Sequence, residues 1–390
     1  MIDVNRSNTY SSLSSVGPAP ACTEPSRGSI KRVLIAAGLA TAVAGNAWAA
    51  QPPEGAVNDS AGNSAMVQSP DGSADPESAA RSQWRTFMAQ NGAPDKGCFH
   101  STYPSFVWEK VDCAVAQPRV HPEHIKPADD KAAVTGAGND YVAYATGLIQ
   151  VATGAFAING VKSEKTVNVP FGGGESKGIL GTNEYSVQLN TNDKETTGAC
   201  SGHSDCTVWQ QFVYATDYIR PGVAGVFMQY WLINWGSSSC PKGGWIFSKP
   251  DECYLNSPVA PATDVPITAL GQIQLQGTAQ FGALDTVTFF YDGEGTSTSN
   301  PDAILEIGGV WNKAEFNVLG DIGGSRADFN SGSSINVYLS LYDGSAAKPT
   351  CLANAGTTGE TNNLSLGSCT ASEITIAGVP IAQIQFIESN

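Results

Sequence analysis

The sequence is poor in histidine, in charge and in familiar catalytic motifs. Only four His occur in 390 residues, and charged residues make up 15% of the chain. No G-x-S-x-G, H-E-x-x-H or P-loop motif is present, so three common hydrolase and nucleotide-binding signatures are excluded. No C-x-x-C pair and no Cys/His cluster of zinc spacing occurs, and we expect neither a metal nor a cofactor.

Basic residues are also scarce, with 21 Lys and Arg against 36 Asp and Glu and a net charge of −15. This balance argues against nucleic acid and anionic membranes as partners. With few Lys and Arg, the chain gains little positive self-repulsion when its carboxylates become protonated. The composition therefore fits an acidic working environment.

No hydrophobic run is long enough to span a bilayer, which takes about 20 residues. The longest, residues 33–45, follows Lys31-Arg32 and precedes the small residues of Ala47-Trp48-Ala49. This is typical of a signal peptide. We predict that residues 1–49 are a signal peptide with an extended n-region, and that the bacterial-type chain is secreted to the periplasm or medium. A buried core helix is the alternative.

Nine cysteines are present, and eight of them follow the predicted cleavage site, since Cys22 precedes it. Eight cysteines allow 105 pairings, and short loops close most easily. We therefore predict disulfides between neighbours, as expected for a secreted protein. The near pairs are Cys98/Cys113, Cys200/Cys206, Cys240/Cys253 and Cys351/Cys369.

The chain divides by composition into four parts. Residues 1–49 are the leader, 50–81 read as a disordered linker or propeptide, and 82–135 as an irregular, disulfide-linked N-terminal subdomain with a short helix at 82–90. Residues 136–390 alternate in period two and predict an all-β antiparallel sandwich. The expected strands are 141–150, 155–159, 163–170, 185–190, 207–215, 225–235, 267–278, 286–291, 303–310, 314–319, 334–342 and 374–387.

Three short motifs have two interpretations each. His121-Pro-Glu-His124 has a ligand-like spacing, but its proline and loop composition favour a solvated turn. Residues 171–175, Phe-Gly-Gly-Gly-Glu, favour a flexible loop over a ligand contact. Residues 291–295, Tyr-Asp-Gly-Glu-Gly, predict a hairpin turn, because the further carboxylates of a calcium loop are missing.

With histidine scarce, a hydrolase has to use carboxylates, amides or a serine. In residues 314–319, Phe316 faces one side of a strand, so Glu315 projects to the other. In residues 207–215, either Gln210 or Gln211 faces the same way as Glu315 if the two strands are neighbours.

A family resemblance runs through these segments, over residues 139–345. In chain order, residues 141–156, 185–190, 209–213, 227–235 and 314–318 resemble the glutamic peptidases of the eqolisin type. That family shows a W-x-G-x-[VA] opening, then "VTGSFTVP", "WVGID", "LQTGV", "YDAWYEWYP" and "AEWIVE". The resemblance rests on order and spacing, with few identities.

The resemblance implies a concanavalin-like β-sandwich and a secreted, monomeric acid endopeptidase that cleaves protein or peptide substrates. Gln210 matches the family's catalytic glutamine and Glu315 its glutamate, with Gln211 replacing Gln210 after a one-residue slip. Glu315 is then the general base and acid, and the glutamine amide donates to the oxyanion. The sequence departs from the family where Ser186 and Asn190 replace the Trp and Asp of "WVGID" and Met228 replaces the Asp of "YDAWYEWYP".

Two non-catalytic alternatives remain at this point. The first is a carbohydrate-binding module that uses exposed Tyr230, Trp231, Trp235 or Trp245, although aromatic residues in strands usually belong to the core. The second is a structural or adhesion protein with no small ligand. A cleft shared by Gln210 and Glu315 favours the peptidase, whereas a concave sheet lined by aromatic residues favours the binding module.

Overall fold

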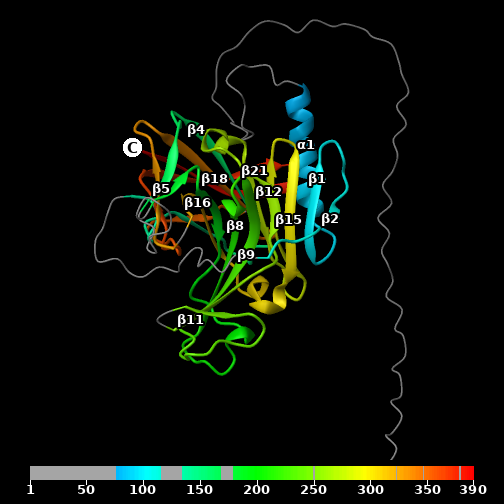
Figure 1. Ribbon diagram of the computed structural model, residues 1–390, viewed down its shortest axis with the longest axis vertical. Coiled ribbons are helices and arrows are strands. Elements are labelled where there is room, and N and C mark those ends of the chain that lie inside the picture. Colours follow the sequence, from blue (N-terminus) through cyan, green and yellow to red (C-terminus); the bar gives the residue numbers. More distant parts are fainter. Residues whose placement is uncertain are drawn as a thin grey trace, which may run out of the picture. The chain divides into compact units, whose positions relative to one another are not determined.

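The computed structural model describes residues 76–115, 134–167, 179–248, 251–321, 323–345, 347–376 and 379–390. Most of this backbone forms β-strands (Figure 1). The predicted signal peptide, most of the predicted linker, the His121/His124 motif and residues 171–175 lie outside the described residues.

The first sheet has nine strands in the spatial order β2-β1-β15-β14-β13-β4-β18-β22-β21, all antiparallel to their neighbours. Buried and partly exposed residues alternate along β18, as the period of two in the sequence predicts. Its strands are β1 Gly97–Thr102, β2 Glu109–Val111, β4 Val151–Asn159, β13 Gln274–Thr278, β14 Leu284–Tyr291, β15 Glu294–Pro301, β18 Ser334–Tyr342, β21 Ser365–Ile376 and β22 Val379–Ser389.

The second sheet has the order β10-β11-β9-β8-β7-β16-β3-β19, with β12 also paired to β9. Its central strands are buried on both faces, and every residue of β7 is buried. Other segments of the chain therefore cover the face of this sheet that points away from the first sheet. The strands are β3 Val142–Tyr144, β7 Tyr185–Asn190, β8 Thr207–Arg220, β9 Val223–Ile233, β10 Ile246–Ser248, β11 Glu252–Asn256, β12 Ala260–Thr263, β16 Lys313–Gly320 and β19 Thr350–Leu352.

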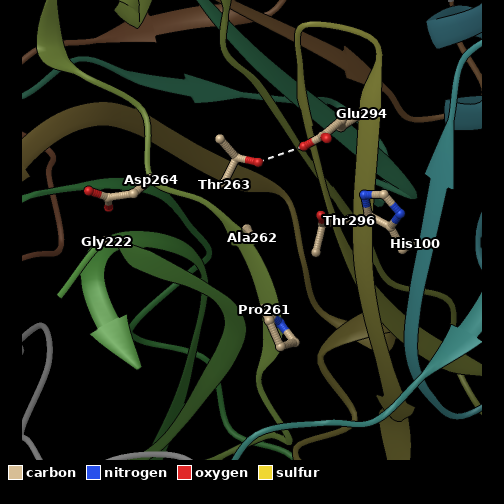
Figure 2. Close-up of a pocket in the computed structure, with 8 residues that line it drawn as sticks. All are labelled: His100, Gly222, Pro261, Ala262, Thr263, Asp264, Glu294 and Thr296. Carbon is tan, nitrogen blue, oxygen red and sulfur yellow. Dashed lines mark hydrogen bonds between the residues drawn. The ribbon is translucent and has the colours of Figure 1, made fainter. Parts of the chain in front are cut away.

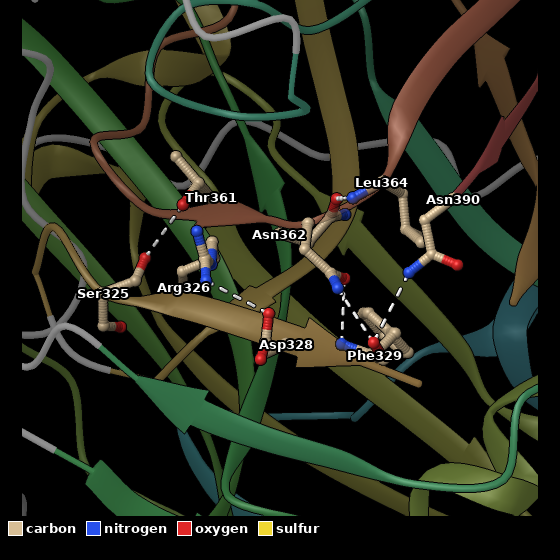
Figure 3. A network of polar contacts seen from close by, with 9 residues as sticks. Ser325, Arg326, Asp328, Phe329, Thr361, Asn362, Leu364 and Asn390 are labelled. Carbon is tan, nitrogen blue, oxygen red and sulfur yellow. Dashed lines mark hydrogen bonds and ion pairs between the residues drawn. The ribbon is translucent and has the colours of Figure 1, made fainter. Parts of the chain in front are cut away.

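A third, four-stranded sheet has the order β20-β17-β5-β6. Its β17–β20 pair is parallel, unlike the pairs of the other two sheets. Polar contacts fix this region, among them the ion pair between Arg326 and Asp328 at 3.2 Å (Figure 3). The strands are β5 Glu164–Val167, β6 Ile179–Thr182, β17 Arg326–Phe329 and β20 Thr361–Asn362.

The two large sheets pack face to face around one hydrophobic core, which confirms the predicted antiparallel all-β sandwich. Aromatic rings of the second sheet fit over glycines of the first. A Cβ atom on Gly154 would lie 2.3 Å from ring atoms of Phe316, and one on Gly277 would lie 2.5 Å from the ring of Phe212. Glycine is required at both positions because a methyl group would overlap the ring.

The described part of the N-terminal segment, predicted to be an irregular, disulfide-linked subdomain at 82–135, contributes β1 to the first sheet. Strand β1 pairs with β15 along its whole length, and helix α1, Pro76–Asn91, covers the outer face of that sheet (Figure 1). Trp84 and Met88 of α1 pack on Phe290. The predicted helix at 82–90 lies within α1 and is confirmed.

Four disulfides link described residues, namely Cys98–Cys113, Cys200–Cys206, Cys240–Cys253 and Cys351–Cys369. They are the neighbour pairs that the sequence predicts, and they fit an oxidising compartment. Among the described residues, no helix has the length and apolar character needed to cross a membrane.

Some strand predictions are wrong in detail. Residues 303–310 form two 3₁₀ turns, η3 Asp302–Ile304 and η4 Ile307–Gly309, in place of a strand. The Asp302 carboxylate accepts hydrogen bonds from the backbone N–H groups of Gly282 and Gly308, and this local bonding favours the turn. A further 3₁₀ turn, η2 Ile267–Gln272, replaces the first half of the strand expected at 267–278. Another, η1 Gly198–Cys200, ends at the first cysteine of the Cys200–Cys206 disulfide.

Candidate active site

Four polar side chains form one row across the outer face of the second sheet. Glu315 of β16 lies opposite Asn190 of β7, Asn190 lies opposite Gln211 of β8, and Gln211 lies opposite Gln229 of β9. Directly opposite residues project to the same face of a sheet. All four are fully buried, the most exposed being Glu315 at 1%.

Hydrogen bonds along this row point toward Glu315. The Trp231 Nε1–H donates to Gln211 Oε1 at 3.2 Å, and Gln211 Nε2 donates to Asn190 Oδ1 at 3.1 Å. Asn190 Nδ2 then donates to Glu315 Oε2 at 3.3 Å. Each amide is held in one orientation by its neighbours, so the row presents an N–H group to the carboxylate.

A second carboxyl group meets Glu315 from the segment before β3. The two carboxyl groups adjoin, since a Cβ atom on Gly356 would lie 2.7 Å from Glu315 Oε1 and 3.3 Å from Asp140 Oδ2. Asp140 Oδ1 accepts from Asn317 Nδ2 at 3.0 Å. Burial raises the pKa of both groups, and the neighbouring charge of Glu315 raises the pKa of Asp140 further. The pKa of Asp140 is raised the more strongly, so Asp140 is the member of the pair that stays neutral when one of them ionises.

A third acid, Glu388 of β22, extends this buried cluster. Its Oε2 accepts from Asn317 Nδ2 at 3.3 Å, and its Oε1 accepts from Asn362 Nδ2 at 3.2 Å. Burial raises the pKa of Glu388 to about 7. No ion pair among the described residues involves these three acids. The acids of this cluster are stabilised by hydrogen bonds from amide groups and by their own protonation, without a neighbouring cation.

One irregular segment covers the carboxyl pair. We call residues 353–360, between β19 and β20, the Thr357 loop. The Thr357 backbone N–H and its hydroxyl both donate to Glu315 Oε2 at 2.7 Å, and Trp209 Nε1–H donates to the Thr357 hydroxyl at 3.1 Å. The Ala355 N–H donates to the backbone carbonyl of Asp140 at 3.2 Å.

The predicted pairing of Gln210 with Glu315 is corrected, because the two residues face opposite sides of the second sheet. Gln210 points into the core, where its Nε2 lies 3.9 Å from Met228 Sδ. Strand β7 lies between β8 and β16, and the register through Asn190 selects Gln211. The open choice between the two glutamines is thus decided by the strand that separates them.

No family model and no curated protein matches the sequence. Among solved structures, the chain is similar to scytalido-glutamic peptidase with a peptide-based transition state analog, at 10% identity and a TM-score of 0.25. That match covers 63% of this chain and 96% of the other. It is also similar to SCP-B, a member of the eqolisin family of peptidases, in a complex with the tripeptide Ala-Ile-His, at 12% identity and a TM-score of 0.24, covering 64% and 97%. Likeness at this level identifies no activity, and the chemistry has to follow from this chain's own residues.

The three departures from the family pattern occupy different places. Asn190 lies in the row and bridges Gln211 to Glu315. Ser186 lies on the same face, where its hydroxyl donates to the backbone carbonyl of Gly320 at 2.8 Å. Met228 faces the core beside Gln210. Of the three, Asn190 alone contacts the Glu315 carboxylate.

Sequence reasoning missed Asp140 and the Thr357 loop. Asp140 follows Gly138-Asn139 just before a strand, and nothing local distinguishes it from an acid in a surface turn. Residues 353–360 consist of small and polar residues and read as an ordinary loop. Both are brought to Glu315 by strand pairing, since β3 lies between β16 and β19.

The other predicted features lie away from the row. His100 lines an open polar hollow of about 460 Å³ together with Thr296, Glu294 and Thr263, and none of the row residues lines it (Figure 2). His203 stacks on Trp235 with 3.4 Å between ring centroids. In the described part of the chain, no group of three or more His, Cys, Asp or Glu residues is arranged to hold a metal.

The aromatic residues proposed for sugar binding are mostly internal. Tyr230 and Trp231 are fully buried and Trp235 is nearly so. Trp245 is partly exposed and lines a hollow of about 510 Å³ next to Asn256 and Asn300. A single partly exposed ring does not form an aromatic platform. The concave sheet lined by these aromatic residues, which would favour a binding module, is therefore not observed.

Proposed function

We propose that the protein is an acid-acting endopeptidase in which Glu315 activates water and Gln211, in place of Gln210, stabilises the oxyanion. The observation that carries the proposal is the pair of adjoining, buried carboxyl groups of Asp140 and Glu315 at the end of the Gln211–Asn190 row. Strongly perturbed carboxyl groups that share a proton are typical of acid and base catalysts.

The chemistry follows from the protonation of the pair. Glu315 takes a proton from water as the water oxygen forms a bond to the carbonyl carbon of the substrate. The carbonyl oxygen becomes an oxyanion, and the Gln211 N–H group that donates to Gln188 Oε1 at 3.4 Å in this structure turns to donate to it. The C–N bond then breaks as Glu315 returns the proton to the leaving nitrogen.

Asp140 has a positioning role in this proposal and keeps its proton throughout. Burial raises the pKa of Glu315, and the hydrogen bonds from Thr357 oppose that rise. The pKa of Asp140 is raised well above its usual range, so Asp140 stays neutral when Glu315 is ionised. The proposed working range is bounded below by protonation of Glu315 and above by ionisation of Asp140.

The substrate class and compartment come from the sequence. The resemblance over residues 139–345 supports protein or peptide substrates, and the four disulfides support an oxidising compartment. We accordingly propose that the protein is secreted, to the periplasm or the medium, as a monomer.

The test is digestion of denatured casein or haemoglobin by the purified protein between about pH 2 and pH 7. Glu315→Gln should lower kcat by roughly 10²-fold or more, while Glu373→Gln, which alters an exposed carboxyl, should leave it unchanged. Proteolysis that survives Glu315→Gln in folded protein would refute the role of Glu315.

A further inference from the structure

The Thr357 loop takes up hydrogen-bonding capacity of the Glu315 carboxylate. Glu315 Oε2 accepts three hydrogen bonds, from the Thr357 N–H, the Thr357 hydroxyl and Asn190. A carboxylate oxygen has about two lone pairs, so three donors saturate it. No acceptor site on Oε2 is left for the water that Glu315 would activate.

Gly356 closes the other side of the same carboxylate. A Cβ atom at this position would lie 2.7 Å from Glu315 Oε1 and 2.9 Å from the Asp140 Cβ. Gly356, Thr357 and Thr358 are all buried, whereas Ala353 and Asn354 are exposed. The loop thus inserts its middle residues between solvent and the carboxyl pair.

Both ends of the Thr357 loop are anchored independently of its middle. On one side β19 pairs with β3, and Cys351 is linked to Cys369. On the other side the Thr361 N–H donates to the Ser325 carbonyl at 2.9 Å, and Figure 3 shows the weaker bond of the Thr361 hydroxyl to the same atom. The loop can therefore lift from Glu315 without undoing either strand.

The composition of the loop makes such a movement feasible. Residues 353–360 are Ala, Asn, Ala, Gly, Thr, Thr, Gly and Glu, with no large apolar side chain. Because hydrophobic stabilisation scales with the apolar area buried, lifting this segment forfeits little of it. Polar contacts hold the loop down, and among them are the two hydrogen bonds from Thr357 to the Glu315 carboxylate that the proposed reaction uses.

We infer that the Thr357 loop is a built-in inhibitor that occupies the Asp140–Glu315 site and has to be displaced before a peptide can bind. The inhibitory role rests on the proposed peptidase function, whereas the occlusion of Glu315 does not. The N-terminal segment does not supply this cover within the described residues, since α1 and β1 lie on the first sheet.

Displacement is tested with Gly356→Val, which places a branched side chain where even a Cβ atom is too close. Ala353→Val is the matched control, because it enlarges an exposed residue of the same loop. The probe is a water-soluble carbodiimide with glycine ethyl ester, which converts accessible carboxyl groups to amides. Mass spectrometry of the peptides that contain Glu315 and the exposed Asp292 gives the two labelling rates.

We expect wild-type Glu315 to react at least roughly tenfold more slowly than Asp292. Gly356→Val should raise the Glu315 rate by roughly tenfold and raise casein digestion with it, whereas Ala353→Val should change neither. Thr357→Ala removes only the hydroxyl contact and should raise the Glu315 labelling rate by less. This variant replaces Gly356→Val in the test if Gly356→Val does not fold.

The two proposals fail separately. Fast labelling of Glu315 in the wild type, or an unchanged rate in both folded loop variants, would overturn the inhibitory loop and leave the peptidase proposal standing. Faster labelling in Gly356→Val with no proteolysis at any acidic pH would uphold the occlusion of Glu315 and refute the peptidase.

Discussion

Asp140 and Glu315 meet carboxyl to carboxyl beneath the Thr357 loop, one from the segment before β3 and the other from β16. Two buried carboxylates in contact repel each other strongly, so the folded state keeps at least one of them protonated. The stability of the native structure therefore depends on pH through the two carboxyl groups that we propose to be catalytic.

The register of β8 predicts different effects for two adjacent glutamines. Gln211→Ala removes the proposed oxyanion donor and should lower kcat by roughly 10²–10³-fold. Gln210→Ala alters the core face and should change stability, with a much smaller effect on kcat in the protein that remains folded. Steady-state kinetics of both variants, corrected for the folded fraction, makes the comparison. The reverse order of effects would restore Gln210 as the oxyanion donor.

Asp140→Asn should retain the contacts of the carboxyl pair without its titration. An asparagine amide can donate to Glu315, and its oxygen can accept from Asn317, as the neutral acid does. We expect nearly unchanged stability in acid and a gain of about 1 kcal/mol or more at neutral pH, because one buried group no longer loses a proton. Urea unfolding at both pH values measures this, and a loss of stability at neutral pH would contradict the assignment of the proton to Asp140.

Stability of the whole fold should fall as the pH rises from acid. The pKa values of Glu388 and Glu164 are raised by burial to about 7 and about 9, so the native state binds more protons than the unfolded state over this range. Their stabilising contribution is fully present below the unfolded value near pH 4 and is lost as the pH passes through about 7 and then 9.

Glu388→Gln isolates one part of this dependence. The variant should lose less stability than wild type between about pH 4 and pH 8, by roughly 3 kcal/mol at most. Glu373→Gln at an exposed position should follow the wild-type curve. Chemical unfolding across this range decides, and parallel curves for wild type and Glu388→Gln would contradict the raised pKa of Glu388.

The fit of Phe316 over Gly154 predicts a position that tolerates no side chain. Gly154→Ala places a methyl group inside the ring contact and should destabilise the protein by about 1–3 kcal/mol, or more if β16 cannot shift. Gly271→Ala is the matched control, since its Cβ would meet its nearest neighbour at 3.5 Å. Because Glu315 is next to Phe316 in β16, a shift of this strand should also lower activity. Thermal unfolding measures the loss of stability, and the casein assay measures the loss of activity.

Much of the fold could be predicted from local patterns. Alternation in β18, the helix within α1 and the turn at Asp292-Gly293 between β14 and β15 are properties of adjacent residues, and all three are confirmed. The near pairs of cysteines are local for the same reason, because short loops close at little entropic cost. The strand predicted at residues 303–310 is wrong. The β-branched residues of this segment favour a strand, whereas hydrogen bonds to the Asp302 carboxylate stabilise turns there.

The sequence by itself determined an antiparallel all-β chain, its disulfide pairs and Glu315 as a candidate, since period, spacing and residue type depend on neighbours in the chain. The tertiary structure alone decided that Gln211 shares a face with Glu315, that Asp140 gives Glu315 its proton-sharing partner, and that residues 353–360 cover both. These relationships depend on which strands lie side by side and in which register. A register shift of one residue would exchange the two faces of a strand, and no local pattern in the sequence records that choice.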